Sequence, residues 1–363
     1  MKMIHVTEVY LPDKEKYKSY IDKIYEGGWI TNNGPLVQEL EKRLEKYLDV
    51  KNVVLVSSGT SALQLAYKVL DLSGEVITTP YSFVATVNSL VHSSLKPVFA
   101  DIHPETYNLN PANIEPLINE NVSAIVPVHI YGNACEVEKI KDIAKHYNLK
   151  VVYDAAHAFY VQYENSSLLG YGDISTISFH ATKMFHTIEG GAIITNDDTI
   201  AEKAKLLRNS GITSSDEIIG AGTNAKMNEY EAVMGLCMLD DMEKIIEGRR
   251  SVMAYYKAAL DGIVQFQKQN PNATQSVSYF PVLFKSEAQR LHVQNSLRVN
   301  NINSKRYFYP SLDTLSYVET LKPMEVSRDI ANRILCLPFY HDLETNVIDR
   351  IVSVIKQACT EKQ

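Results

Sequence analysis

The sequence predicts an α/β protein with a largely parallel sheet, followed by a smaller α+β region. Three observations lead to this prediction. From Gly34 to about Thr195, short apolar runs alternate with helical periods, which is typical of a parallel sheet covered by helices on both faces. After Gly262 this alternation stops and the order of elements changes. The length of 363 residues corresponds to about 2.4 domains of roughly 150 residues each, which favours more than one domain.

Seven β-rich runs are expected to form the strands of the first region. They are short, rich in valine and isoleucine, and separated in most cases by a helical stretch: residues 53–56, 75–79, 97–100, 124–128, 150–154, 174–179 and 192–195. The last two runs have little sequence between them, so we expect an antiparallel arrangement there.

Helical periodicity fills most of the remaining sequence. In the first region it predicts helices over residues 60–70, 84–92, 137–147, 198–208 and 228–260, the last of them long. In the second region we expect a strand near 277–283, a helix over 287–299 and a final helix from about 345.

The charge balance argues against a polyanionic partner. Lys and Arg total 36 against 43 Asp and Glu, giving a formal charge of -7, so neither nucleic acid nor a membrane surface is expected to bind. The uncharged stretch of residues 76–95 contains Pro80, Asn88 and His92, so we expect it to be buried within the protein and not to span a membrane. The four cysteines are far apart and the start of the chain has no signal-peptide pattern, which predicts a cytoplasmic protein.

A candidate anion site follows the first predicted strand. The residues Ser57-Ser58-Gly59-Thr60-Ser61 are small and hydroxylated and lead into a helix, whose free N–H groups and dipole favour an anion. An ordinary helix cap is the alternative interpretation. The run matches neither a P-loop nor a G-x-G-x-x-G fingerprint, which argues against ATP and NAD as ligands.

Two further candidates end later strands. Asp154 ends an apolar run, where burying a carboxylate costs free energy unless an ionic partner binds it. The alternative interpretation is that its side chain caps the backbone that follows the strand. Lys183 follows a strand in a loop flanked by Glu189-Gly-Gly191, whereas a lone lysine is usually a solvated surface cation. The order of anion loop, strand-end Asp and Lys suits pyridoxal 5'-phosphate (PLP): phosphate on the helix, Asp on the ring nitrogen and Lys on the aldehyde.

These motifs resemble the DegT/DnrJ/EryC1/StrS sugar aminotransferase family. The residues of segments 79–83 and 178–183 are most similar to those of enzymes that aminate dTDP-keto-6-deoxyhexoses. The resemblance runs from Thr31 to about Met238 and extends more weakly beyond. It depends on segments that are specific only together: 31–35, 57–60, 79–83, 127–132, 154–157, 178–183, 189–191 and 222–227. The family implies a fold-type I PLP enzyme, with a mostly parallel seven-stranded sheet in a large domain of residues 32–247. A smaller α+β C-terminal domain of residues 248–363 follows, with residues 1–31 packed alongside.

The resemblance also implies roles for individual residues. Lys183 matches the lysine that forms a Schiff base, and Asp154 matches the partner of the pyridine nitrogen. Other positions match further cofactor contacts: Gly59, Thr60 and Ser178 at the phosphate, Phe83 stacked on the ring, His157 beside the ring oxygen, and Asn224, with Lys226, reaching the phosphate from the second subunit. The family thereby implies a homodimer with shared active sites and no metal.

Residues for substrate binding are less specific. His186 stands where the family pattern leads us to expect Asn, and we take it as a substrate candidate. A sugar pyrophosphate needs cationic partners, for which Arg306, Lys305 and Arg208 are candidates, and Tyr309 belongs to the aromatic run beside two of them. Surface cations and core aromatic packing are the alternatives.

The expected function is PLP-dependent transamination, because Lys183 is retained where some relatives carry His and act as dehydratases. The specific hypothesis is conversion of dTDP-4-keto-6-deoxy-D-glucose to dTDP-4-amino-4,6-dideoxy-D-glucose with L-glutamate, for amino-sugar or O-antigen biosynthesis. One alternative is amination at C3 of a dTDP-3-keto-6-deoxyhexose. Others are a PLP-binding regulatory protein, for which no DNA-binding arm is visible, and a nicotinamide oxidoreductase, which lacks its glycine fingerprint.

Overall fold

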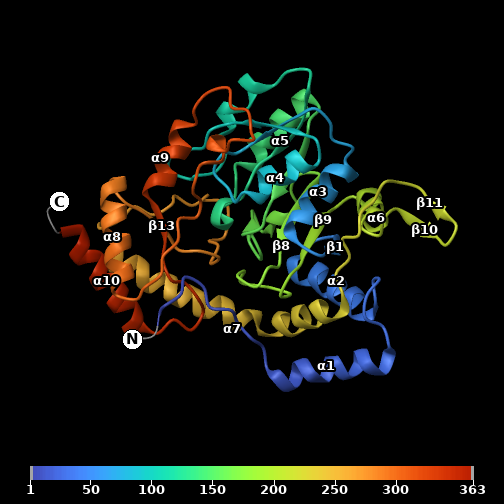
Figure 1. Ribbon diagram of the computed structural model, residues 1–363, viewed down its shortest axis with the longest axis horizontal. Helices are drawn as coiled ribbons and strands as arrows, with labels where there is room; N and C mark the ends of the chain where they lie inside the picture. The colour runs from blue at the N-terminus through green and yellow to red at the C-terminus, as the bar shows by residue number, and fades with distance from the viewer. Residues whose placement is uncertain (1–2, 361–363) are drawn as a thin grey trace.

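A seven-stranded sheet forms the centre of the computed structural model, which describes residues 3–360 (Figure 1). The order across the sheet is β1-β9-β8-β5-β4-β2-β3. The strands in chain order are β1 (Asn52–Val56), β2 (Glu75–Thr78), β3 (Lys96–Phe99), β4 (Val122–Val126), β5 (Lys150–Asp154), β8 (Ile174–Ser178) and β9 (Gly191–Thr195). The predicted α/β fold with seven strands is therefore confirmed.

Strand directions follow from the connections. The pairs β2–β3, β2–β4, β4–β5 and β5–β8 are parallel. Strand β9 is antiparallel to both of its neighbours, β8 and β1, so β1 runs with the others. The chain returns from β8 to β9 through the loop of residues 179–190, which contains no helix. The antiparallel arrangement expected here is confirmed, and this loop contains Lys183.

Both faces of the sheet are buried. In β1, Val53 and Leu55 pack in one hydrophobic cluster, whereas Val54 and Val56 pack in another on the opposite face. This alternation is the two-residue period of a strand with helices on both sides. The helices of this domain are α2 (Pro35–Leu48), α3 (Gly59–Val69), α4 (Ala85–His92), α5 (Val137–Tyr147) and α6 (Asp198–Leu207).

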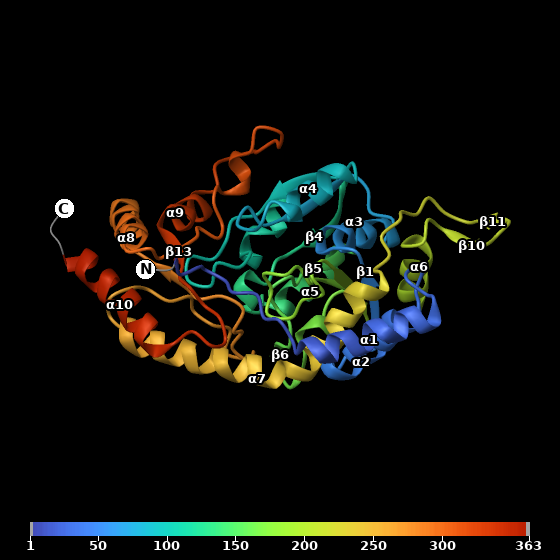
Figure 2. The same cartoon turned by 60° about the horizontal axis from the view of Figure 1, so that its bottom comes forward.

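Helix α7 (Glu229–Leu260) connects the sheet domain to the rest of the chain. Its 32 residues span about 48 Å at 1.5 Å per residue. An Asn228–Glu231 capping box begins the helix. Figure 2 shows α7 running beneath both regions. The expected domain limit at residues 247 and 248 lies inside this helix, so the division into 32–247 and 248–363 stays a prediction.

The C-terminal region is built from short strands and helices. Its elements are β12 (Pro281–Leu283), α8 (Glu287–Val299), α9 (Glu325–Arg333), β13 (Ile334–Cys336) and α10 (Thr345–Thr360). The strand expected near 277–283 was predicted too long, because only residues 281–283 pair with β13. The carbonyl groups of Val277 and Ser278 instead accept hydrogen bonds from the Arg249 side chain, which holds this segment away from the sheet.

Several elements lie outside the sequence predictions. They are α1 (Lys14–Gly27), α2, α9, β13, the hairpins β6 (Gln162–Tyr163) with β7 (Ser166–Ser167) and β10 (Ile212–Ser214) with β11 (Glu217–Ile218), and the 3-10 helices η1 (Pro111–Asn113), η2 (Glu115–Leu117), η3 (Ile130–Gly132), η4 (Leu168–Gly170) and η5 (Leu312–Thr314). Helix α2 had a clear signal, since Leu36, Leu40, Leu44 and Leu48 repeat every four residues on its buried face. Within residues 3–360, no helix combines the length and apolar character that a membrane crossing requires.

A buried carboxylate at the start of α7 is hydrogen-bonded to the N-terminus of α2. The Glu229 carboxylate accepts hydrogen bonds from the backbone N–H groups of Leu36 and Val37, each at 2.9 Å. These N–H groups belong to the first turn of α2, where no intrahelical acceptor exists and the helix dipole favours a negative charge. Glu229 therefore joins two helices that flank the sheet.

Replacing Glu229 should destabilise the protein strongly. In Glu229→Ala, two buried N–H groups lose their acceptor, and we expect the free energy of unfolding to fall by about 2–4 kcal/mol. Urea unfolding followed by circular dichroism measures this loss. Glu243→Ala, on the exposed side of the same helix, is the control and should change stability by less than about 0.5 kcal/mol. Equal stability of the two variants would contradict the capping role.

Candidate active site

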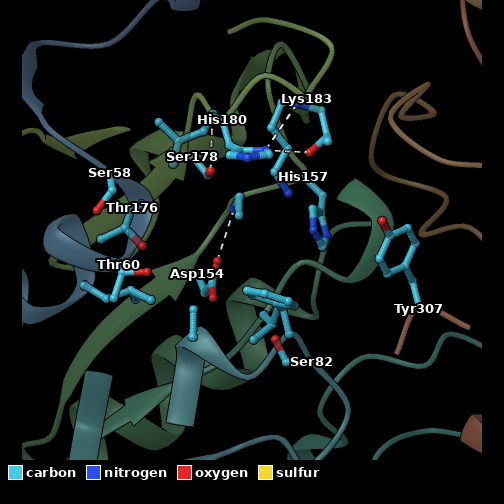
Figure 3. Close-up of a pocket in the computed structure, with 18 of the residues that line it drawn as sticks. Ser58, Thr60, Ser82, Asp154, His157, Thr176, Ser178, His180, Lys183 and Tyr307 are labelled. Carbon is cyan, nitrogen blue, oxygen red and sulfur yellow. Dashed lines mark hydrogen bonds between the residues drawn. The ribbon is translucent and has the colours of Figure 1, made fainter. Parts of the chain in front are cut away.

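A cavity of about 330 Å³ lies at the carboxyl ends of the central strands. Open α/β sheets bind ligands at this edge. Figure 3 shows Ser58 and Thr60 on one side of the cavity, Tyr307 on the other and Asp154 between them. Seven of the eight residues expected to contact the cofactor or act in catalysis line this cavity, and Asn224 does not. The seven are Gly59, Thr60, Phe83, Asp154, His157, Ser178 and Lys183.

The N-terminus of α3 forms one wall of the cavity. Ser58 and Ser61 make a capping box, in which each side chain accepts a hydrogen bond from the other's backbone N–H group. In the part of the chain that the structure describes, this leaves the N–H groups of Gly59 and Thr60 without an intrahelical acceptor. Free N–H groups at a positive helix end are a suitable site for a phosphate.

Gly59 allows α3 to approach the strand beside it. A Cβ atom on Gly59 would lie 2.8 Å from the Ser178 Cβ atom, closer than real Cβ contacts allow. The absence of a side chain therefore brings the helix end next to the Ser178 hydroxyl, which lies at the end of β8. Two elements thus supply donors to one small region, which fits a phosphate group.

Asp154 is a buried carboxylate at the end of β5. One oxygen accepts a hydrogen bond from the Thr86 hydroxyl at 2.8 Å, and the other accepts from the Ala156 N–H group at 3.2 Å. Burial raises the pKa of Asp154 above its ordinary value, while both hydrogen bonds and the nearby Lys183 oppose that rise. A protonated ring nitrogen in the cavity would give this carboxylate an ionic partner.

Lys183 extends from the β8–β9 loop into the same cavity and is partly buried. Its Nζ atom lies 3.3 Å from the hydroxyl of Tyr279. Burial lowers the pKa of the Lys183 amine to about 8, and Asp154 partly opposes that change. A substantial fraction of the amine is therefore neutral near pH 7–8, which a nucleophilic amine requires.

His157 and Phe83 complete the surroundings of the proposed ring. His157 is buried, and within residues 3–360 its Nδ1 atom has no hydrogen-bond partner. Burial also lowers the pKa of His157 well below its ordinary value, so the ring is neutral and an unpaired Nδ1 can meet a ligand. Phe83 is 56% exposed although it lines the cavity, which suits a ring that covers a planar ligand.

The sequence candidates for substrate binding lie elsewhere. His186 is buried, its Nε2 donates to the Tyr10 carbonyl and its Nδ1 accepts from the Ile188 N–H group. Arg306 stacks over the Tyr309 ring at 3.2 Å and bonds to the Ala331 carbonyl. None of these three candidates, His186, Arg306 and Tyr309, lines the cavity of its own chain, and their substrate roles stay predictions.

Two other candidates also lie outside this cavity. Arg208 is buried in an ion pair with Glu41 and donates to the Leu55 carbonyl, so its partners are structural. Asn224 is exposed on a loop that pairs with Asn209, and it is absent from the cavity of its own chain. That position is compatible with the expected contact to a second subunit, which stays a prediction.

Sequence reasoning missed several residues of the C-terminal region that line the cavity. Tyr279, Tyr307 and Phe308 are among them, and Lys305 was considered only as one of several possible cations. The signal for Lys305 and Tyr307 was the aromatic and basic run that the sequence analysis noted. Tyr279 had no signal, because only the fold brings residue 279 next to residue 183.

The donor set fits PLP. The helix end with Ser178 suits its phosphate, the buried Asp154 suits its ring nitrogen, the unpaired His157 Nδ1 suits its ring oxygen and the Lys183 amine suits its aldehyde. Among the described residues, no group of three or more His, Cys, Asp or Glu side chains could hold a metal ion.

Comparisons with known proteins agree with this geometry. The model of the DegT/DnrJ/EryC1/StrS aminotransferase family matches residues 12–356. A dTDP-4-amino-4,6-dideoxy-D-glucose transaminase of Shigella dysenteriae is 43% identical, over 98% of this chain and 99% of its own. A transaminase of the same name from Escherichia coli is 37% identical over 98% of each chain. The crystal structure of DesI, studied in the presence of its TDP-sugar product, has a TM-score of 0.95 at 30% identity and covers 99% of this chain and 94% of its own.

Adding a methyl group at Gly59 should weaken cofactor binding. In Gly59→Ala the new Cβ would collide with Ser178, push α3 away and separate the phosphate donors, so we expect PLP affinity to fall about 10- to 100-fold. Titration of the PLP-free protein with PLP, followed by absorbance, measures the dissociation constant. Gly27→Ala is the control, because a Cβ there meets nothing within 4 Å. Unchanged affinity in Gly59→Ala would exclude the phosphate site at α3.

Proposed function

We propose a specific reaction for this chain, which belongs to the DegT/DnrJ/EryC1/StrS aminotransferase family and is a PLP-dependent transaminase. It transfers the amino group of L-glutamate to C4 of dTDP-4-keto-6-deoxy-D-glucose and forms dTDP-4-amino-4,6-dideoxy-D-glucose. The observation that supports this substrate most is the full-length similarity, at 43% and 37% identity, to two transaminases named for that amino sugar.

The cavity residues divide the work of transamination among them. When bound, PLP supplies an aldehyde carbon that accepts the amino group and an electron-poor ring that stabilises negative charge on the adjacent carbon. Asp154 holds a proton at the ring nitrogen, which keeps the ring electron-poor. The Lys183 amine would take a proton from the α-carbon of the amino donor and return one to the carbon that was the aldehyde carbon of PLP. Its pKa of about 8 suits both transfers, because the amine can accept and release a proton near neutral pH.

Lys305 supports the proposal that the substrate is an anion. Lys183 and Lys305 are the lysines that line the cavity in the described part of the chain, and Lys183 is reserved for proton transfer. The Lys305 backbone is fixed by two hydrogen bonds to Cys336, so its side chain starts from a rigid position. Its ammonium lies 5.5 Å from the Tyr307 ring centre. A cation in the lining of the cavity can form an ion pair with the pyrophosphate of a nucleotide sugar.

A homodimer with shared active sites is part of the proposal. Support comes from Asn224, which is exposed and does not line the cavity of its own chain. Exposed apolar side chains near the cavity, Phe83 at 56% and Ile188 at 45%, are also compatible with a covering subunit. We further propose a cytoplasmic location, supported by free cysteines at all four positions, and a role in O-antigen biosynthesis.

Incubation with candidate sugars tests the reaction directly. With L-glutamate and dTDP-4-keto-6-deoxy-D-glucose, we expect equimolar 2-oxoglutarate and an amino sugar whose nitrogen NMR places at C4. Lys183→Ala should lower turnover by at least about 1,000-fold, because its amine has no replacement. Amination of a dTDP-3-keto-6-deoxyhexose in its place would favour the C3 alternative. PLP binding without turnover of either sugar would favour a regulatory protein.

Removing the Lys305 charge should separate binding from chemistry. In Lys305→Met we expect KM for the sugar nucleotide to rise about 10- to 100-fold with kcat within about twofold, because a contact to the pyrophosphate is the same in the ground and transition states. Steady-state kinetics with each substrate varied in turn measures this. Lys322→Met, an exposed lysine away from the cavity, is the control. A rise in KM for L-glutamate only would assign Lys305 to the donor carboxylate.

A further inference from the structure

Tyr279 connects the C-terminal region to the reacting lysine. It precedes β12 in the chain, lines the cavity, and its hydroxyl lies 3.3 Å from the Lys183 Nζ atom. The two residues are 96 positions apart, and helix α7 lies between them in the chain. Among the described residues, this hydroxyl is the hydrogen-bond partner that the structure gives to the Lys183 amine.

The position of Tyr279 is fixed from two sides. The neighbouring Ser278 hydroxyl donates to the His157 carbonyl at 2.7 Å, which ties the segment to the loop after β5. Arg249 of α7 is buried and donates to the Val277 and Ser278 carbonyls at 3.2 and 3.4 Å. The Tyr279 ring also meets the His157 ring edge-on, with centroids 4.9 Å apart. The hydroxyl is therefore held next to the amine by the same loop that follows Asp154.

A phenol is well suited to an amine that changes its charge. Burial raises the pKa of the Tyr279 hydroxyl above its ordinary value, so the group keeps its proton throughout the physiological range. The Lys183 amine, with a pKa of about 8, occurs in both forms in that range. A hydroxyl has one proton and two lone pairs, so it can donate to the neutral amine and accept from the ammonium form.

We propose that Tyr279 is a further catalytic residue, whose hydroxyl orients the Lys183 amine and stays hydrogen-bonded to it in both protonation states. This inference rests on the proposed function only for the role of Lys183 in transamination. The other titratable or charged side chains that line the cavity around Lys183 come from several elements: Asp154, His157, His180, Glu189, Lys305 and Tyr307.

The test measures the amine before any substrate is present. PLP-free protein is mixed with PLP between pH 6 and 10, and the rate of cofactor attachment is followed by absorbance. The neutral amine attacks the aldehyde, so the rate rises with pH, and for the unmodified protein we expect a midpoint near 8. In Tyr279→Phe the midpoint should fall by about half a unit to one unit. The hydrogen bond to Tyr279 stabilises the charged ammonium form of Lys183 more than the neutral amine, so its loss favours the neutral form. The loaded variant should also convert L-glutamate at least about tenfold more slowly.

Tyr307→Phe is the matched control, since it removes another hydroxyl from the same cavity, one that acts on the Lys183 amine through electrostatics and not through a hydrogen bond. Its attachment midpoint should move by less than half of the shift in Tyr279→Phe, because no hydrogen bond to the amine is lost. Circular dichroism should show that both variants are folded. An unchanged midpoint in Tyr279→Phe, or an equal shift in Tyr307→Phe, would overturn the inference. Neither readout uses a sugar, so a shifted midpoint in a protein that fails to aminate dTDP-4-keto-6-deoxy-D-glucose would reject the substrate and keep the role of Tyr279.

Discussion

The burial of Asp154 and Lys183 in one cavity is the constraint on which the rest of the site depends. Taking charged groups out of water costs several kcal/mol per ion unless partners compensate for the loss. Burial raises the pKa of Asp154 and lowers the pKa of Lys183, and each group opposes the shift of the other. Thr86 and the Ala156 backbone stabilise the carboxylate, and Tyr279 contacts the amine. The sheet must therefore bring α4, the β5 end, the β8–β9 loop and the C-terminal region to one point.

Anion binding follows a similar local logic. The chain has a net charge of -7, yet the cofactor phosphate and the proposed substrates, L-glutamate and a sugar pyrophosphate, are all anions. The α3 helix end needs no charged side chain to attract a phosphate, because its dipole and free N–H groups are aimed at the cavity. Gly59 makes that geometry possible by letting the helix approach Ser178. Net charge limits long-range attraction, whereas a few oriented groups decide what binds at short range.

Helix α7 gives the site its second half. It begins at the carboxylate of Glu229, which caps α2 beside the sheet, and it contains Arg249, which holds the segment of Tyr279. A single rigid element thus relates the sheet domain to the residues that cover the cavity from the C-terminal region (Figure 2). A change in the direction of α7 would move Tyr279, and with it a hydrogen bond to Lys183, although neither residue lies on the helix.

The sequence by itself determined the α/β class and most strands and helices, because periodic burial is a local signal. Its strand-end motifs and the family resemblance also pointed to seven residues that line the cavity, and their cofactor contacts stay predictions. It did not reveal α1 or α9, and it overextended the strand that ends at Leu283, since Arg249 decides the path of residues 277 and 278. Only the tertiary structure decided which aromatic and basic side chains of the C-terminal region reach the cavity. Lys305, Tyr307 and Tyr279 line it, whereas His186, Arg306 and Tyr309 do not. The physical reason is that these choices depend on how segments distant in the chain pack against each other, and no local pattern records that packing.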